Sequence, residues 1–284
     1  MAHFVCDIET DMFVEPSFYT NHARGFLRAD LIGRTQGSVH MGFRLCDLKP
    51  DGNIDTCVHS FEKGLFITEG EIELNRNGEL FHLHKHDFAL IPIGVPHAIR
   101  NTSSAPARFI EKCAPRPKED DEWQDSFFSK PLNWNLNGEP TLVSEPLQRM
   151  VGHFDLSQLP ASQRVDNHMW GWSKKLLIDK VLGAHQFDLF IIEFDEGGQT
   201  SSHDHNFEEA YFVLDGEVTF TAEGAEYVLK PGTIAWSGVG APHGFYMNRG
   251  TSCRWLEVMS PQPPVQFGNR RMANWDLIRS ELAT

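Results

Sequence analysis

The sequence has little positive charge. It contains 25 Lys and Arg residues against 39 Asp and Glu residues, which gives a formal net charge of −14. Nucleic acids and anionic membrane surfaces bind clustered Lys and Arg side chains. The composition therefore argues against both as partners, and a small molecule is the expected ligand.

Long apolar runs and paired cysteines are also missing. No stretch of about 20 apolar residues is present to form a transmembrane helix. Asp7, Glu9 and Asp11 add charge where a secretory leader would be apolar. The five cysteines form no C-x-x-C pair, which favours free thiols in a reducing compartment over a disulfide framework. We therefore expect a cytoplasmic protein.

Strand signals dominate the rest of the sequence. Residues 187–194 and 210–214 are rich in β-branched and aromatic side chains. Asp215-Gly216 and Asn77-Gly78 are typical of hairpin turns that require a positive φ. Short strands separated by glycine-containing turns predict an all-β chain with closed or sandwich-like barrels. Helical spacing occurs mainly at residues 272–282, which predicts one short C-terminal helix.

An internal repeat relates the two halves of the chain. Adding 146 to a residue number aligns the halves without a gap. The matched pairs include Gly70 and Gly216, Gly78 and Gly224, Gly94 and Gly240, Pro96 and Pro242, and His97 and His243. A repeat of this length indicates duplicated domains. We predict an N-terminal barrel over residues 1–113 and a C-terminal barrel, with the short helix, over residues 151–284.

Residues 114–150 have the composition of a linker between these domains. Pro115, Pro117 and the charged run at 118–122 mark a change of character. The segment also contains four large aromatic residues, namely Trp123, Phe127, Phe128 and Trp134. Because burying aromatic surface is favourable, we expect the linker to pack against the barrels.

Three histidines and a glutamate in the second half carry the strongest functional signal. His203 and His205 alternate, so a strand would point both to one face, and Glu209 follows with the same parity. His243 must come from a separate strand. Three imidazoles and one carboxylate suit a first-row divalent metal. The pattern predicts a metal site formed by these four side chains.

The same residues resemble the motifs of the cupin superfamily. The first motif, G-x5-H-x-H-x3,4-E-x6-G, is matched by Gly197, His203, His205, Glu209 and Gly216. The second is matched by Gly232, Gly240 and His243, whereas Gly238 and Met247 depart from it at turn and packing positions. The resemblance implies two cupin-type β-barrels in tandem, each a double-stranded β-helix or jelly roll. It also implies that the two histidines, the glutamate and the late histidine hold the metal.

The first half has an altered version of this site. The alignment places Cys57, His59, Lys63 and His97 at the four ligand positions. Lys63 replaces Glu209 and puts positive charge where an anionic ligand would stand. We therefore expect the first barrel to serve structure or dimerisation. The alternatives are a metal site of Cys57, His59 and His97, and a pocket in which Lys63 meets an anionic ligand.

A second group of histidines in the first half lies away from these positions. His82, His84 and His86 alternate, so they would share one face of a strand. The alignment sets them opposite residues that approach a turn. We expect a polar outer face there.

Strand parity also predicts the walls of a substrate pocket in the second barrel. The expected walls are Tyr211, Val213, Phe245 and Met247. Tyr211 is the expected hydrogen-bond donor and, with Glu209, a candidate catalytic residue. Glu209 would act as a general base if it left the metal during turnover. Glu208 has the opposite parity and is expected outside the barrel.

The predicted site suggests three functions. One divalent transition metal per chain, with Fe or Mn favoured and Ni, Cu or Zn as alternatives, would hold a small oxygen-bearing organic metabolite. A non-haem dioxygenase is favoured. The alternatives are a Mn-dependent hydrolase, isomerase or decarboxylase, and a non-catalytic binding protein. We expect a homodimer.

The family resemblance narrows this choice modestly. Bicupins include flavonol-cleaving and other ring-cleaving dioxygenases, oxalate decarboxylases and ureidoglycine aminohydrolases. The last are similar to this chain in having a metal-free first barrel and an Ala-Tyr-x-x-x-x-Gly segment, which is matched by Ala210-Tyr211 to Gly216. Their ligand set, however, has a glutamate and a glutamine where this chain has His203 and His243.

Overall fold

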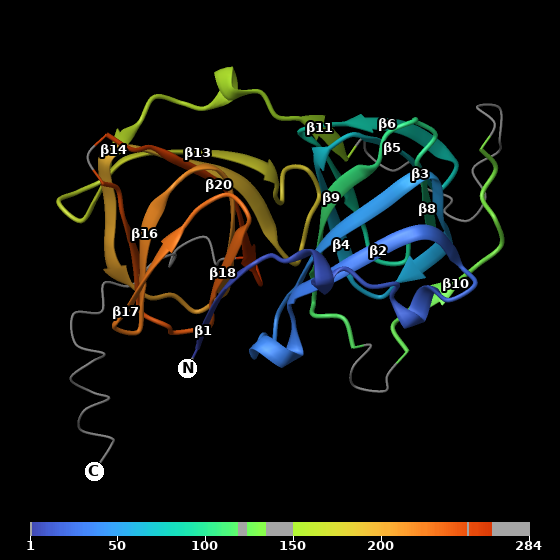
Figure 1. The fold of residues 1–284 in the computed structure, drawn as a ribbon, viewed down its shortest axis with the longest axis horizontal. Helices are drawn as coiled ribbons and strands as arrows, with labels where there is room; N and C mark the ends of the chain where they lie inside the picture. Colours follow the sequence, from blue (N-terminus) through green and yellow to red (C-terminus); the bar gives the residue numbers. More distant parts are fainter. Residues whose placement is uncertain (1, 119–123, 135–149, 249, 263–284) are drawn as a thin grey trace, which may run out of the picture.

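The computed structural model describes residues 2–118, 124–134, 150–248 and 250–262. Two curled antiparallel sheets, each with ten strands, carry this part of the chain (Figure 1). The only helices in the described ranges are single turns of 3-10 type, none of which could cross a bilayer. The all-β prediction with two cupin-type barrels is confirmed. The expected helix at 272–282 lies outside the described residues.

The N-terminal sheet has the strand order β11-β7-β4-β9-β3-β8-β5-β6, with β2 and β10 both paired to β3. Its strands are β2 (Ala23–Ile32), β3 (Gly42–His59), β4 (Glu62–Glu69), β5 (Glu71–Arg76), β6 (Glu79–His84), β7 (Asp87–Ile91), β8 (His97–Arg100), β9 (Ala107–Ala114), β10 (Ser126–Phe128) and β11 (Val151–His153). The single-turn helices η1 (Thr10–Met12), η2 (Ser17–Tyr19) and η3 (Arg34–Gln36) flank β2.

The C-terminal sheet repeats this order as β1-β18-β15-β20-β14-β19-β16-β17, with β13 paired to β14 and β12 paired to β13. Its strands are β1 (His3–Asp7), β12 (Gln163–Arg164), β13 (Met169–Ile178), β14 (Asp188–His203), β15 (Glu208–Gly216), β16 (Val218–Ala222), β17 (Ala225–Leu229), β18 (Thr233–Ser237), β19 (His243–Tyr246) and β20 (Cys253–Ser260). The turn η5 (Leu156–Gln158) precedes β12.

The offset of 146 residues holds in three dimensions. It maps β2, β7, β8 and β9 onto β13, β18, β19 and β20 with identical bounds. Two of the matched glycines show why the repeat keeps them. Gly70 and Gly216 have φ values of 69° and 74°, and a Cβ atom at either would lie within 2.6 Å of a backbone oxygen. Only glycine tolerates both conditions.

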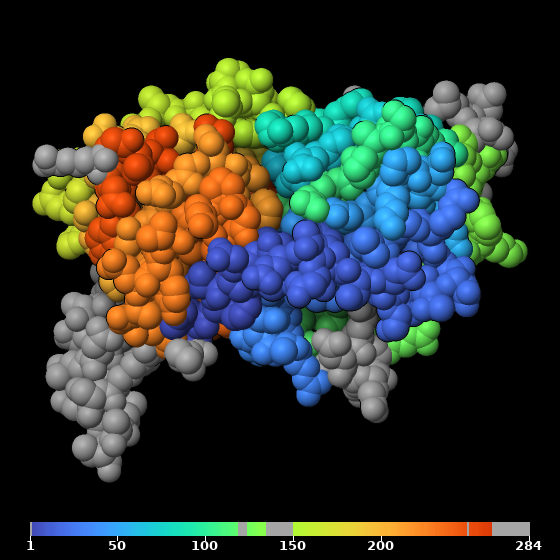
Figure 2. Space-filling view, in the orientation of Figure 1, coloured from blue at the N-terminus to red at the C-terminus, as the bar shows by residue number. Residues whose placement is uncertain are grey.

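Each barrel borrows an edge strand from the other half of the chain. β1 pairs with β18, and β11 pairs with β7. Val5 lies opposite Ala235 and Val151 opposite Ala89, so the two exchanges are equivalent under the repeat. Figure 2 shows the N-terminal segment crossing onto the C-terminal half. The sheets therefore cross the predicted boundaries at 113 and 150, because edge strands offer unpaired backbone groups to any neighbouring segment.

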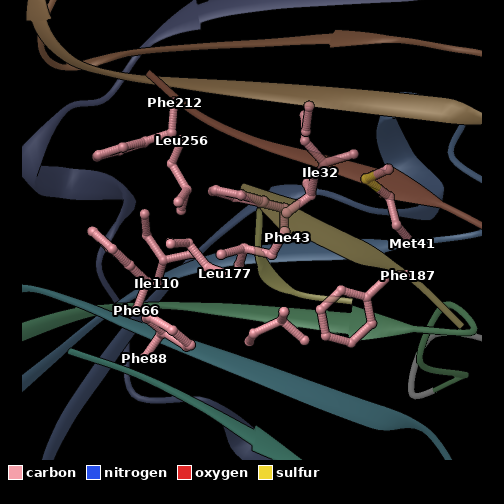
Figure 3. Packing of buried hydrophobic residues seen from close by; sticks show 14 of the residues in the cluster. Ile32, Met41, Phe43, Phe66, Phe88, Ile110, Leu177, Phe187, Phe212 and Leu256 are labelled. Carbon is pink, nitrogen blue, oxygen red and sulfur yellow. The ribbon is translucent and has the colours of Figure 1, made fainter. Parts of the chain in front are cut away.

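Apolar side chains from both halves form one core between the barrels. Phe43, Phe66 and Ile110 of the first half cluster with Phe212 and Leu256 of the second (Figure 3). All of them are buried. Burying this surface joins the halves far more firmly than a solvated linker would.

Two equivalent glutamates clamp this interface. Glu208 accepts hydrogen bonds from Ser38 Oγ at 2.5 Å and from the Val39 amide at 2.7 Å. Glu62, its counterpart, accepts from the amides of His185 and Gln186, each at 2.9 Å. Glu208 does point out of its barrel, but it is buried against the other half rather than facing solvent. Strand parity correctly predicted that the Glu208 side chain points out of its barrel, but it did not predict the contact with the other half of the chain.

The described part of the linker lies on the first barrel. β10 pairs with β3, Phe128 stacks on His22 with ring centroids 3.7 Å apart, and Trp134 lies under the Arg100 guanidinium. Phe127 is 47% exposed, so it does not share this packing. Trp123 lies outside the described residues.

The three alternating histidines of the first half do not behave alike. His82 and His84 are on β6 with side chains about 60% exposed, as expected for an outer face. His86 follows the strand in a turn with φ of 70° and stacks on Phe66. The turn ends the alternation before His86.

Candidate metal centre

The second barrel brings the four predicted ligands together from four places in the chain. β14 ends at His203, His205 follows in the connection to β15, and Glu209 lies on β15. His243 begins β19 and is the register partner of His203. The candidate ligand atoms of the three histidines all lie within 4.8 Å of one another, and every one of these side chains is buried. The convergence comes from strand pairing across 40 residues of sequence.

Each imidazole is held through one ring nitrogen. The Nδ1 atoms of His203, His205 and His243 lie 2.9, 2.7 and 2.9 Å from the backbone oxygens of Ser201, Phe207 and Ala241. A carbonyl oxygen can only accept, so each Nδ1 carries the proton and each Nε2 presents a lone pair. Metal-binding histidines are usually oriented in this way.

The lone pairs converge on a carboxylate. Glu209 Oε2 lies 2.7 Å from His205 Nε2 and 3.1 Å from His243 Nε2. Both sides of these contacts are acceptors unless a proton or a cation lies between them. A divalent metal would satisfy the imidazoles and the carboxylate at once, so the residues present fit such an ion.

The pKa shifts of the candidate ligands also favour a bound cation. Burial raises the pKa of Glu209, but the neighbouring His205 and His243 lower it further, so that it lies well below its ordinary value. Burial lowers the pKa of His205, while the carboxylate of Glu209 raises it above normal overall. Burial and the nearby His243 lower the pKa of His203 to about 3. An anionic carboxylate next to these imidazole nitrogens favours a cation at the site.

Tyr211 forms a hydrogen bond with one of the candidate ligands, Glu209. Its hydroxyl donates to Glu209 Oε2 at 2.6 Å, and its side chain is fully buried. Burial, and then the charges of Glu209 and Glu257, raise the pKa of Tyr211 well above its usual value. The phenol therefore stays protonated and orients the carboxylate.

A cavity of about 110 Å³ opens beside the ligands. His203 and Glu209 line it, together with Lys174, Thr200, Glu257 and the largely apolar side chains of Met169, Trp172, Phe190, Ile192, Phe194, Phe245, Trp255 and Met259. Of the four predicted wall residues, Phe245 lines this cavity. Tyr211, Val213 and Met247 are not among its lining residues, although all four belong to the same apolar cluster of the barrel. The walls come mainly from β13, β14 and β20, whereas parity was applied only to β15 and β19.

Sequence reasoning missed two charged residues in this cavity. Glu257 follows Trp255 and precedes Met259 in the inward alternation of β20, and Lys174 follows Trp172 in the same way on β13. A charged residue on an otherwise apolar inward face was the available signal. The repeat offered a second one, because Lys174 aligns with Arg28 and Glu257 with Glu111.

Both residues are perturbed by burial. Burial, and then the charge of Glu209, raise the pKa of Glu257 well above its ordinary value, although the indole of Trp255 donates to its carboxyl at 2.8 Å. Burial lowers the pKa of Lys174, whereas the charge of Glu257 opposes that shift. Lys174 Nζ lies 3.4 Å from the centre of the Phe190 ring.

The equivalent place in the first barrel has a different chemistry. Cys57 Sγ lies 3.5 Å from His59 Nε2 and 3.6 Å from His97 Nε2. Lys63 occupies the position of Glu209, and its Nζ atom forms an ion pair with Glu111 at 2.9 Å. Burial raises the pKa of Cys57 to about 12, so its thiol is protonated and is not a reactive thiolate.

Comparison with known proteins identifies the family. The cupin domain model matches twice, at residues 44–112 and 190–259. The polyketide synthase CurC of Streptomyces cyaneus is 30% identical over 97 residues, a match that spans 33% of this chain and 63% of that protein, which is less than two thirds of its length.

Several solved structures share the fold. A glyoxylate-induced protein of Pseudomonas aeruginosa superposes with a TM-score of 0.67 at 18% identity, covering 96% of this chain and 92% of the other. Oxalate decarboxylase of Lactobacillus farciminis superposes with a TM-score of 0.66 at 14% identity, covering 99% of this chain and 93% of the other. Salicylate 1,2-dioxygenase of Pseudaminobacter salicylatoxidans superposes with a TM-score of 0.64 at 15% identity, covering 78% of this chain and 71% of the other. With two matched domains and two barrels of this architecture, the chain belongs to the cupin superfamily and is a bicupin.

Proposed function

We propose that the chain is a metal-dependent enzyme of dioxygenase type that acts on a small oxygen-bearing organic metabolite. The observation that carries this proposal is the placement of the candidate ligands His203 and Glu209 in the wall of a cavity with mainly apolar and aromatic sides. One divalent metal per chain, Fe or Mn, is the proposed cofactor. It would supply coordination for a substrate oxygen and, if redox-active, for dioxygen.

The residues of the chain have separate tasks in this proposal. His203, His205, Glu209 and His243 hold the metal, and backbone carbonyls orient the three imidazoles. Tyr211 fixes the carboxylate of Glu209 through its hydroxyl and takes no proton from it, since the phenol remains the donor. Trp172, Phe194 and Trp255 restrict water and orient the apolar part of a substrate.

A second candidate is non-redox chemistry, such as decarboxylation or hydrolysis. It is favoured by Glu257, a buried carboxyl group in the same cavity that can hold a proton for delivery to a substrate. Oxalate decarboxylase, one of the structures with this fold, acts by such chemistry according to its name.

Oxygen consumption separates the two candidates. We expect the Fe-loaded protein to consume dioxygen when aromatic or diketone compounds are added, and the His205→Ala variant to consume none. If turnover is metal-dependent but dioxygen is not consumed, the non-redox reaction replaces the dioxygenase. A compound that binds without any metal-dependent turnover would indicate a binding protein. The homodimer and the cytoplasmic location remain predictions, which size-exclusion chromatography and cell fractionation would test.

A further inference from the structure

Lys174 places a positive charge in the cavity without an acidic partner. Among the described residues, no carboxylate oxygen comes within ion-pair distance of its ammonium group, which instead lies over the Phe190 ring at 3.4 Å. The carboxylates that share the cavity are engaged elsewhere. Glu209 is contacted by His205, His243 and Tyr211, and Glu257 accepts the indole hydrogen of Trp255. Lys174 is half-buried, and a cation partly withdrawn from water is costly unless an anion joins it.

The first barrel shows how the same position is neutralised. Arg28 is the counterpart of Lys174, and its Nη2 pairs with Asp30 at 3.0 Å. The residue equivalent to Asp30 is Leu176, which carries no charge. The second barrel therefore keeps a cation at this position and has no carboxylate at the position of the exposed Asp30.

The first barrel is also filled where the second is hollow. Tyr19 is 3% exposed and packs against Phe26 in the apolar core of its barrel, with ring centroids 5.2 Å apart. Its counterpart Val165 is 59% exposed and lies outside the second barrel. The second barrel thus lacks the internal plug, and it has an open cavity in its place.

We propose that this cavity binds a small aromatic carboxylate, with the carboxylate group on Lys174 and the ring between the aromatic walls. This proposal rests on the proposed function and names the substrate class for the same site. A volume of about 110 Å³ limits the enclosed part of a ligand to a single ring at most. Trp172, Phe194 and Trp255 supply flat apolar surfaces. The other end of the ligand then lies towards His203 and Glu209.

Paired probes test this assignment. Benzoate and benzamide, and phenylacetate and phenylacetamide, differ within each pair mainly in charge. Binding is measured by calorimetry on metal-loaded protein and again after chelation, because the metal itself also attracts carboxylates. We expect wild-type protein to bind a carboxylate about tenfold or more tightly than its amide in both states.

Three variants separate Lys174 from the rest of the site. Lys174→Met should remove the preference for the carboxylate and leave amide binding unchanged, whereas Lys174→Arg should retain most of it. Lys175→Met is the matched control, because Lys175 is the next residue on β13 and does not line the cavity. It should behave as wild type.

The results distinguish failure of this inference from failure of the proposed function. An unchanged carboxylate preference in Lys174→Met, or no such preference for either pair in wild type, overturns the assignment of Lys174. If the Lys174-dependent preference is present but the loaded protein consumes no dioxygen, the anion site stands and the dioxygenase proposal fails.

Discussion

His97 and His243 occupy the same register position in the two barrels, opposite Cys57 in the first and His203 in the second. Around this shared frame the charges are arranged in opposite ways. In the first barrel the Lys63 ammonium meets the Glu111 carboxylate, and Arg44 pairs with the same glutamate at 3.0 Å. In the second barrel both equivalent positions are glutamates, Glu209 and Glu257.

This difference shows how a duplicated scaffold can separate stability from function. The first barrel completes its own buried ion network and fills its interior with Tyr19. The second leaves a carboxylate among imidazole nitrogens and a cation beside a cavity, and under the proposals above a metal and an anionic ligand would complete it. Unsatisfied buried groups cost stability, and one filled barrel that shares a core with the other can offset that cost.

Removing one imidazole should show the largest contrast between the barrels. We expect His205→Ala to lose the metal and to lower metal-dependent activity by about 100-fold or more, because a metal ligand is gone. The fold should persist, since strand pairing does not depend on the ion. His59→Ala, at the equivalent position of the first barrel, should leave the metal content at about one ion per chain. Elemental analysis and circular dichroism measure both. Metal loss in His59→Ala would mean that the first barrel also binds an ion.

Removing the Tyr19 ring, which fills the interior of the first barrel, should leave a cavity there like that of the second barrel. Tyr19→Ala removes a fully packed aromatic ring and should lower the free energy of unfolding by about 3 to 4 kcal/mol. The equivalent change, Val165→Ala, affects an exposed side chain and should shift it by less than about 0.5 kcal/mol. Denaturant unfolding provides the measurement. Equal effects would show that Tyr19 is not an internal plug.

Breaking the ion network of the first barrel should cost about 3 kcal/mol. Lys63→Met leaves the Glu111 carboxylate buried with Arg44 as its remaining close ion-pair partner, and an incompletely compensated buried charge is strongly destabilising. The double variant Lys63→Met/Glu111→Gln should recover part of the loss, which thermal or urea unfolding would detect. A single variant as stable as wild type would argue against the network.

A smaller effect should come from Lys112, a fully buried residue whose counterpart in the second barrel is Val258. Burial lowers the pKa of Lys112 from 10.5 to about 7. The unfolded chain then binds more protons between these values, so the penalty of Lys112 is largest below pH 7 and disappears as pH rises through 10.5.

Lys112→Met should therefore stabilise the protein by about 1 to 2 kcal/mol at pH 7, with a smaller gain at pH 10. Unfolding curves at the two pH values give the comparison. Lys130→Met, at an exposed position, serves as the control and should show no such trend. A gain that grew with pH would contradict a lowered pKa for Lys112.

Much of this architecture was predictable from residue spacing alone. The 146-residue offset found the duplication because turns such as those at Gly70 and Gly216 accept only glycine. The alternation of His203 and His205, with Glu209 in the same parity, identified side chains that share a direction. Lys63 in the place of Glu209 marked the first barrel as different. Each of these signals is local, since it depends on strand period or on the backbone of a single turn.

Other features depend on contacts between distant segments. The exchange of β1 and β11, the burial of Glu208 against Ser38, and the inward position of Lys174 follow from how two twisted sheets meet, which no local spacing encodes. The core positions of Tyr211, Val213 and Met247 were set by the strands that face them. The sequence alone determined two barrels and predicted one ligand set. Tertiary packing decided which interior stayed open, because a cavity is defined by the side chains that fail to fill it.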